Sequence, residues 1–190
     1  MRVGLLGGSF NPAHAGHRHV ATLARKRLRL DQVWLLVSPG NPLKPHEGMA
    51  PFAQRLAGAQ RLGDGRRVLA TGIEAALGTR FTFDTLRMLR RRFPRVRFVW
   101  LMGADILVQL PRWRRWVAML RRIGFVVLPR PGYTRLGLAG KAARRFRPAR
   151  RADRAAVTLP GDAAAWALLT GPLSAESATA IRNQAKGAVP

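Results

Sequence analysis

Two histidines, His14 and His17, lie three residues apart in the segment GGSFNPAHAGH, which spans residues 7–17. Imidazole side chains in such a position could cap or pack against a helix, ligate zinc, or donate hydrogen bonds to phosphate oxygens. Zinc is disfavoured because the segment contains no Glu and no third ligand lies nearby in the sequence. If a helix begins here, the spacing places both rings on one face. His19 falls outside this spacing and is expected at the surface.

The residues before the histidines favour phosphate binding over a purely structural role. The apolar run at residues 3–7 predicts a buried parallel strand, and Gly7, Gly8, Ser9 and Phe10 would leave it at its carboxyl end. Glycine lets a ligand approach backbone N–H groups, and the following helix would direct its positive end to the same place. The pattern is neither Gly-x-Gly-x-x-Gly nor a P-loop.

The composition is typical of a single globular domain. The chain has 190 residues, 47% of them hydrophobic, which is enough to form a sizeable core. It has no cysteine, which excludes disulfides, thiolate metal sites and cysteine nucleophiles. No apolar run is long enough to span a membrane, and the apolar start is too short for a signal peptide. We expect a soluble cytoplasmic protein with one domain over residues 1–190.

The net charge is strongly positive, at +25 with a pI near 12.0. Residues 87–154 hold 20 Lys or Arg but only two acids, Asp105 and Asp153. Such a surface attracts polyanions, so a basic nucleic-acid-binding protein is the alternative from a different class. However, a GC-rich genome would produce the same richness in Arg, Ala, Gly and Pro, and the aromatic residues that bind single strands are not interleaved here. We expect no specific nucleic-acid partner and no membrane partner, and the sequence leaves the oligomeric state open.

Strands alternate with helices along the chain, which indicates an α/β, doubly wound fold with a mainly parallel sheet. In such folds the ligand binds outside the carboxyl ends of the strands. Residues 135–154 are basic and hold few large apolar residues, so we expect a mobile excursion there. The expected strands are 3–7, 33–37, 67–73, 96–102 and 125–128, with short ones at 155–159 and 166–169, and the expected helices are 17–30, 52–62, 82–93, 113–122 and 177–184.

Five motifs occur in the order found in the nucleotidyltransferase superfamily, and they extend along nearly the whole chain. GSFNPAHAGH (residues 8–17) resembles the superfamily's (H/T)-x-G-H signature, in the Asn-Pro-x-His form of the nicotinate mononucleotide adenylyltransferases. The others are PGNPLK (39–44), TFDTL (82–86), GAD (103–105) and SATAIR (177–182). Ala13, where many members have Pro, is a mild departure. The resemblance implies a Rossmann-like nucleotidyltransferase fold.

The resemblance also implies a reaction, the transfer of AMP from ATP to nicotinate mononucleotide in NAD biosynthesis. The products would be nicotinate adenine dinucleotide and pyrophosphate. The acceptor phosphate is already an anionic nucleophile, so the enzyme must align the reactants and neutralise charge. Mg²⁺ is expected to arrive with ATP, because few acids are present to hold it independently. Nicotinamide mononucleotide and phosphopantetheine stay open as acceptors, although a basic site favours the acid over the amide.

Site residues follow from the resemblance, motif by motif. His14, His17 and Arg182 would be catalytic. Nicotinate mononucleotide would contact Asn41, Lys44, Thr85 and Trp113, with Trp113 stacked on its ring. ATP would contact Gly7, Gly8, Ser9, Phe10, His14, His17, Gly103, Asp105, Ser177, Thr179 and Arg182.

Several of these residues have structural alternatives that the sequence leaves open. Asp105 could be the N-cap of a helix from residue 106 onward, and Ser177 and Thr179 also suit an N-cap. Trp113 and Trp116 lie three residues apart, which is typical of core residues on one helical face.

Overall fold

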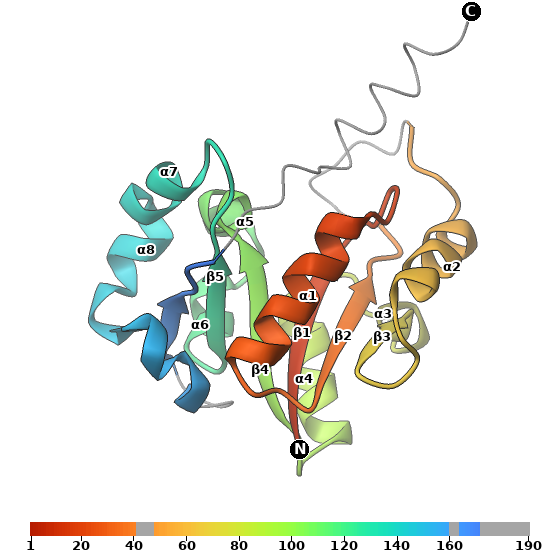
Figure 1. Cartoon of the computed structure of the whole chain (residues 1–190), viewed down its shortest axis with the longest axis horizontal. Helices are drawn as coiled ribbons and strands as arrows, with labels where there is room; N and C mark the ends of the chain where they lie inside the picture. Colours follow the sequence, from red (N-terminus) through yellow and green to blue (C-terminus); the bar gives the residue numbers. More distant parts are fainter. Residues whose placement is uncertain (41–47, 160–163, 172–190) are drawn as a thin grey trace, which may run out of the picture.

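The computed structural model describes residues 1–40, 48–159 and 164–171. Its strands are β1 (Arg2–Gly8), β2 (Gln32–Val37), β3 (Val68–Thr71), β4 (Arg97–Gly103), β5 (Gly124–Leu128), β6 (Arg150–Arg151) and β7 (Trp166–Leu168). In the described residues they form one sheet in the order β3-β2-β1-β4-β5-β7-β6, with every neighbouring pair parallel (Figure 1). This confirms the predicted doubly wound, Rossmann-like α/β fold, whose strand order changes direction at β1.

The central strands are buried on both faces, as their unbroken apolar sequences predict. In β1, Val3 and Leu5 belong to the core on one face of the sheet, and Leu6 belongs to the core on the other. In β4, Trp100 and Leu101 divide between the two faces in the same way. Both faces therefore need a layer of helices.

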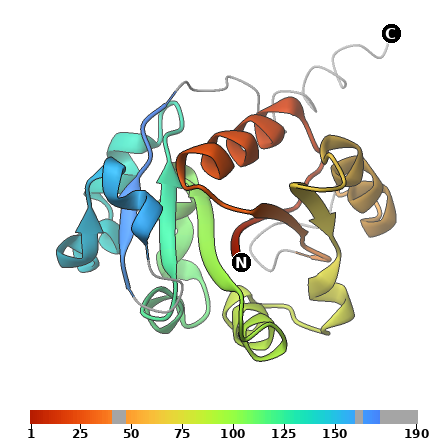
Figure 2. The same ribbon diagram turned by 60° about the horizontal axis from the view of Figure 1, so that its bottom comes forward.

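Helices cover the sheet on both sides (Figure 2). The longer ones are α1 (Ala15–Arg27), α2 (Phe52–Leu62) and α4 (Thr82–Arg92), and the shorter ones are α3 (Ile73–Ala76), α5 (Ala104–Gln109), α6 (Trp116–Leu120), α7 (Thr134–Ala139) and α8 (Lys141–Arg145), with 3₁₀ turns η1 (Leu110–Arg112), η2 (Arg147–Ala149) and η3 (Asp153–Thr158). α1 and α2 lie over the face that carries Leu6, and α4, α6 and α8 over the opposite one. None of the helices in the described ranges is long and apolar enough to cross a membrane.

The helix after β1 is displaced from its predicted bounds of 17–30. It begins at Ala15, because His14 has extended backbone and acts as its N-cap. It ends at Arg27, and two residues later Arg29 adopts a φ of 49°, which a helix cannot contain. The helix predicted at 52–62 is confirmed, and the one predicted at 82–93 ends one residue earlier.

Two further boundaries differ from the prediction. The third strand ends at Thr71 instead of residue 73, because the chain turns into α3 there. The helix predicted at 113–122 begins only at Trp116, since Arg115 has a φ of 53°. The strand predicted at 166–169 is confirmed as β7, whereas the one predicted at 155–159 is wrong, because the chain forms η3 there. The helix predicted at 177–184 lies outside the described residues.

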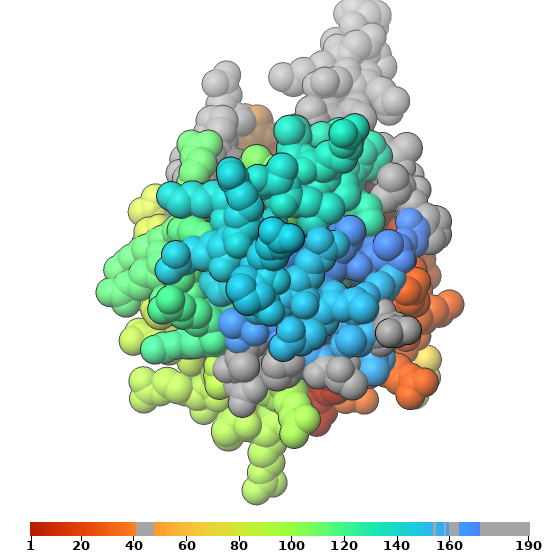
Figure 3. All heavy atoms as spheres, turned by 90° about the vertical axis from the view of Figure 1, so that its left-hand side faces the viewer, coloured from red at the N-terminus to blue at the C-terminus, as the bar shows by residue number. Residues whose placement is uncertain are grey.

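Residues 135–154 differ from the mobile excursion that we expected. They supply most of α7, all of α8 and η2, and the edge strand β6, and they cover one side of the molecule (Figure 3). Phe146 attaches this segment to the core: its ring lies 6.1 Å from that of Phe125, and its carbonyl oxygen accepts a 2.8 Å hydrogen bond from Trp166 Nε1. Ala142 and Ala143 are buried in the same core, so apolar contacts hold a segment that is rich in basic residues.

Candidate active site

A pocket opens at the carboxyl ends of β1, β2 and β4, beside the point where the strand order changes direction. Its walls also include the start of α4 and the residues that follow η1. Residues that are distant in the sequence but were predicted to bind substrates therefore meet in one place: Gly7, Gly8, Ser9, Gly103 and Trp113.

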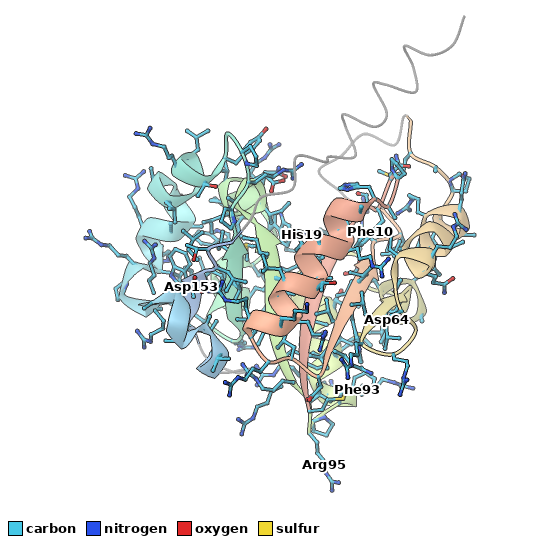
Figure 4. The ribbon with its side chains drawn as sticks, in the orientation of Figure 1. Phe10, His19, Asp64, Phe93, Arg95 and Asp153 are labelled. Carbon is cyan, nitrogen blue, oxygen red and sulfur yellow. The ribbon has the colours of Figure 1, made fainter. Side chains whose placement is uncertain are left out.

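The glycines at the end of β1 are explained by packing as well as by access to the backbone. A Cβ atom at Gly7 would lie 2.7 Å from the ring of Trp100, so no larger residue fits over that indole. A Cβ atom at Gly8 would approach the ring of Phe10 to 3.2 Å. Phe10 is buried with a φ of 49°, and it marks a sharp turn at the end of β1 (Figure 4). Trp100 lines the pocket, although sequence analysis treated it only as a strand residue.

His14 and His17 lie directly after this turn, at the beginning of α1. Their ring centroids are 3.9 Å apart, and the His17 ring is 4.7 Å from that of Phe10. The backbone N–H of His14 donates to Nδ1 of His17 at 3.3 Å. In a neutral imidazole, an accepting Nδ1 places the proton on Nε2, so His17 offers Nε2 as a donor. The histidines thus form a capping arrangement, and their role toward phosphate stays a prediction.

Asp105 lies beside the pocket at the end of β4. It belongs to the first turn of α5, whose N-cap is Gly103, so the N-cap alternative for Asp105 is wrong. Its Oδ2 accepts a 2.5 Å hydrogen bond from Nη1 of Arg130, and within the described residues its Oδ1 has no hydrogen-bond partner. A Cβ atom at Gly103 would clash with that Oδ1, so this glycine makes room for the carboxylate.

Trp113 and Trp116 serve different parts of the molecule, although the sequence placed them on one helical face. Trp113 follows η1 with extended backbone, lines the pocket, and meets Trp100 edge-on with 6.3 Å between ring centroids. Trp116 begins α6 and contacts Phe146, with 6.1 Å between centroids. The left-handed Arg115 separates them: both indoles pack against the hydrophobic core, and Trp113 also lines the pocket.

Glu74 of α3 is a pocket residue that sequence analysis missed. It is buried, and its Oε1 accepts a 3.1 Å hydrogen bond from Oγ1 of Thr85. Burial raises the pKa of Glu74, and the hydrogen bond from Thr85 opposes that rise. Thr85 is fully buried behind Glu74 and also bonds to Thr79 at 2.9 Å. Of the threonines in the TFDTL motif, Thr82 is among the described pocket residues and Thr85 is not.

Three arginines, Arg80, Arg112 and Arg114, contribute to the pocket wall. Arg114 lies 3.6 Å from the carboxylate of Asp84, and its guanidinium is 4.8 Å from the ring centroid of Phe81. These cations outnumber the single pocket carboxylate, so the wall suits phosphate or carboxylate groups. Sequence analysis missed them because nothing in the local sequence distinguishes them from the many surface arginines.

The side chains described near the pocket do not form a site for a resident divalent cation. In the described part of the chain, no group of three or more His, Cys, Asp or Glu residues could hold a metal ion. The two carboxylates nearest the pocket are already engaged, Glu74 by Thr85 and Asp105 by Arg130. The predicted residues that lie outside the described ranges are Asn41, Lys44, Ser177, Thr179 and Arg182.

Comparisons with known proteins identify the family of this chain. The cytidylyltransferase-like family model matches residues 5–184. Relatives named "probable nicotinate-nucleotide adenylyltransferase" include one from Gluconobacter oxydans, 56% identical over 96% of this chain and 94% of its own. Another, from Gluconacetobacter diazotrophicus, is 54% identical over 97% of this chain and 86% of its own.

A solved structure supports the fold alone, because its sequence identity is low. It is the Plasmodium falciparum nicotinic acid mononucleotide adenylyltransferase complexed with NaAD, which matches with a TM-score of 0.69 at 14% identity, over 96% of this chain and 82% of its own. The family model and the relatives each span nearly the whole chain. The chain therefore belongs to the cytidylyltransferase-like family and, within it, to the nicotinate-nucleotide adenylyltransferases.

Proposed function

We propose that this chain transfers AMP from ATP to nicotinate mononucleotide, forming nicotinate adenine dinucleotide and pyrophosphate for NAD biosynthesis. The observation that carries the proposal is one pocket with two kinds of wall. The glycine loop forms one side, and Trp113 with basic side chains forms the other; the two histidines follow the loop, at the start of α1. That combination suits two phosphorylated substrates, one of which carries a planar ring with a carboxylate. The names of the relatives state the same activity.

The chemistry is a displacement at the α-phosphorus of ATP. A 5′-phosphate oxygen of the acceptor forms the new P–O bond, and the bond to the bridging oxygen between the α- and β-phosphates breaks, so that pyrophosphate leaves. The nucleophile is already anionic, so no proton has to be removed. The protein accelerates the reaction by holding two anions in line and neutralising charge on the α-phosphate and on the leaving group.

The ATP half of the site is proposed around the start of α1. Backbone N–H groups of the glycine loop, the positive end of this 13-residue helix and Nε2 of His17 would donate to the phosphates. Oδ1 of Asp105 would accept from ribose hydroxyls beside Gly103. Ser177, Thr179 and Arg182 keep their predicted roles toward the β- and γ-phosphates.

The acceptor half is proposed around Trp113. Its indole would stack on the pyridine ring, and Arg112 and the first residue of α4, Thr82, offer positive charge and helix-end N–H groups to the carboxylate. This electrostatic environment favours nicotinate over its uncharged amide, which is the reason to prefer the acid as acceptor. Asn41, Lys44 and Thr85 stay predictions for the same half.

Magnesium is proposed to enter as part of the substrate, MgATP. The metal would neutralise charge on the triphosphate, and the pocket's arginines, with the histidines at the start of α1, would add to that effect.

The experiment that tests this function is to incubate the purified protein with MgATP and nicotinate mononucleotide and to identify the product by mass. Formation of nicotinate adenine dinucleotide with one pyrophosphate per product is expected. Pyrophosphate release without that dinucleotide would contradict the acceptor, and no turnover would contradict the activity.

A further inference from the structure

Arg55 of α2 is buried, with 4% of its surface exposed, yet no carboxylate among the described residues pairs with it. Its guanidinium donates to backbone carbonyl oxygens instead. Nη1 donates to Ser9 and to Ser38, each at 2.7 Å, while Nη2 donates to Pro39 at 3.0 Å and Nε to Ala50 at 2.9 Å. One side chain therefore satisfies four carbonyl groups from three separate segments.

Two of these four carbonyls belong to residues of the pocket wall. Ser9 follows β1 and Ser38 follows β2, and both line the pocket. Pro39 and Ala50 flank the stretch of chain that carries two of the predicted acceptor-binding residues. Asn11 adds a second tie at the same place, because its side chain donates to the carbonyl of Gly48 at 2.9 Å and accepts from the N–H of Ala50 at 3.2 Å. Strand ends that are adjacent only in the fold are thus joined through Arg55.

Burying a charge in this way is costly. Burial lowers the pKa of Arg55, although a guanidinium stays protonated even so. A hydrophobic side chain of similar volume would often stabilise a fold as well as a buried cation does. The planar guanidinium of Arg55 instead donates directional hydrogen bonds to the loops after β1 and β2 and so fixes their relative positions. A hydrophobic contact has no such directionality.

Peptide geometry carries the effect of these hydrogen bonds to the other side of the two loops. In a trans peptide the N–H points opposite to the C=O. Because the Ser9 carbonyl faces Arg55, the N–H of Phe10 is directed away from the guanidinium, and the same holds for Pro39 and the N–H of Gly40. A guanidinium behind the loops thus orients backbone donors on their other side and adds positive potential there.

We propose that Arg55 is a positioning residue for substrate phosphates, which holds the loops after β1 and β2 in the relative placement that the reaction requires. The proposal rests on the proposed function, because its readout is the kinetics of that reaction. Arg55 is not proposed to contact substrate. It acts by holding the carbonyl groups of Ser9 and Pro39, and with them the N–H groups of the residues that follow. If the loops shift by about 1 Å, we expect kcat/KM of the enzyme to fall on the order of 10²-fold.

The test compares Arg55→Lys, which keeps the charge and the alkyl stem, with Arg55→Met, which keeps only the stem. Arg90→Met is the matched control, because Arg90 also donates to a backbone carbonyl, that of Arg122 at 2.6 Å, at the opposite end of the sheet. Folding of each variant is checked by circular dichroism and thermal unfolding, and kinetics are measured well below the midpoint.

The KM values distinguish misplaced loops in a folded enzyme from a smaller amount of folded enzyme. Partial unfolding lowers the amount of active enzyme and hence the maximal rate, but it leaves KM unchanged. We expect Arg55→Lys to raise KM for ATP and for the acceptor and to lower kcat/KM about 10²-fold, with Arg55→Met at least as impaired and Arg90→Met near wild type.

Three results would overturn the proposal. One is an unchanged KM in a folded Arg55→Lys variant, and the second is an equal effect in Arg90→Met. The third is failure of Arg55→Lys itself to fold, which would make Arg55 a residue of the fold as a whole. Inactivity of the wild-type chain, in contrast, would contradict the proposed function.

Discussion

The ring of His17 is held by its own helix cap, since its Nδ1 accepts a hydrogen bond from the backbone N–H of His14. This leaves Nε2 as the proton-bearing nitrogen, which suits donation to an α-phosphate oxygen. We expect His17→Ala to reduce kcat by about 10²–10³, the loss seen when one donor to a developing charge is removed. Steady-state kinetics on the folded variant provide the measurement.

A matched variant on the same helix is His19→Ala, because His19 does not share the spacing of the pair. It should retain near wild-type turnover. A folded His17→Ala enzyme with a normal rate would reduce His17 to its capping role.

Trp113 and Trp116 allow a second comparison at the residue scale. Trp113→Ala removes a pocket wall, so we expect KM for nicotinate mononucleotide to rise by at least about tenfold, the effect of losing roughly 1.4 kcal/mol of stacking. KM for ATP should change much less. Trp116→Ala removes a core contact with Phe146, so its expected effect is a lower unfolding temperature with KM values near wild type. Equal losses for both substrates in Trp113→Ala would indicate general loss of packing.

Residue types and spacing predicted the glycine loop and the histidine pair, because these residues are continuous in sequence. Gly103 and Trp113 were predicted from the resemblance to the nucleotidyltransferases. Contacts between residues that are far apart in the sequence could not be predicted in this way. The need for Gly7 comes from Trp100, which lies on a different strand, and the role inferred for Arg55 comes from carbonyl groups that only the fold brings together.

Element packing next to the acceptor half depends on a buried polar connection between α3 and α4. Glu74 accepts from Thr85, and burial places its pKa above the usual carboxyl value of 4.5. Between the unfolded and the folded pKa the native state binds more protons, so this carboxyl reduces stability as the pH rises. We expect Glu74→Gln to be increasingly more stable than wild type as the pH is raised from 4 to 8.

Thermal unfolding of both proteins across that pH range measures this effect. Thr85→Val removes the hydrogen-bond donor to Glu74, so this variant should unfold at a lower temperature than wild type at neutral pH. A difference in unfolding temperature between Glu74→Gln and wild type that stays constant with pH would contradict the assignment.

Elements with a strong local signal were predicted well, and those decided by tertiary contacts were not. The central strands are apolar throughout because helices cover both faces of the sheet. The start of α6 depends on the left-handed Arg115, and the order in residues 135–154 depends on Phe146 meeting Phe125 and Trp166. Neither feature has a periodicity that could be recognised in the sequence.

The positive charge of the molecule extends to the end of the sheet opposite the pocket. Arg95 projects from the end opposite Phe10 (Figure 4), and Arg29, Arg67 and Arg122 are exposed near the starts of neighbouring strands. A field spread this widely predicts weak, nonspecific attraction of polyanions. We expect oligonucleotides to bind with Kd no tighter than about 10⁻⁶ M at physiological salt, and the affinity to fall steeply as salt is added.

Titrations with duplex and single-stranded oligonucleotides at several salt concentrations would measure this. Nanomolar, sequence-selective binding at physiological salt would show instead that the basic surface has a specific nucleic-acid partner.

The proposed function requires that this pocket accept nicotinate mononucleotide as the partner of ATP. The most direct measurement is kcat/KM for pyrophosphate release by the purified protein with MgATP, compared among nicotinate mononucleotide, nicotinamide mononucleotide and phosphopantetheine. The basic, tryptophan-walled acceptor half predicts a strong preference for nicotinate mononucleotide. A preference for either of the other two acceptors would contradict it.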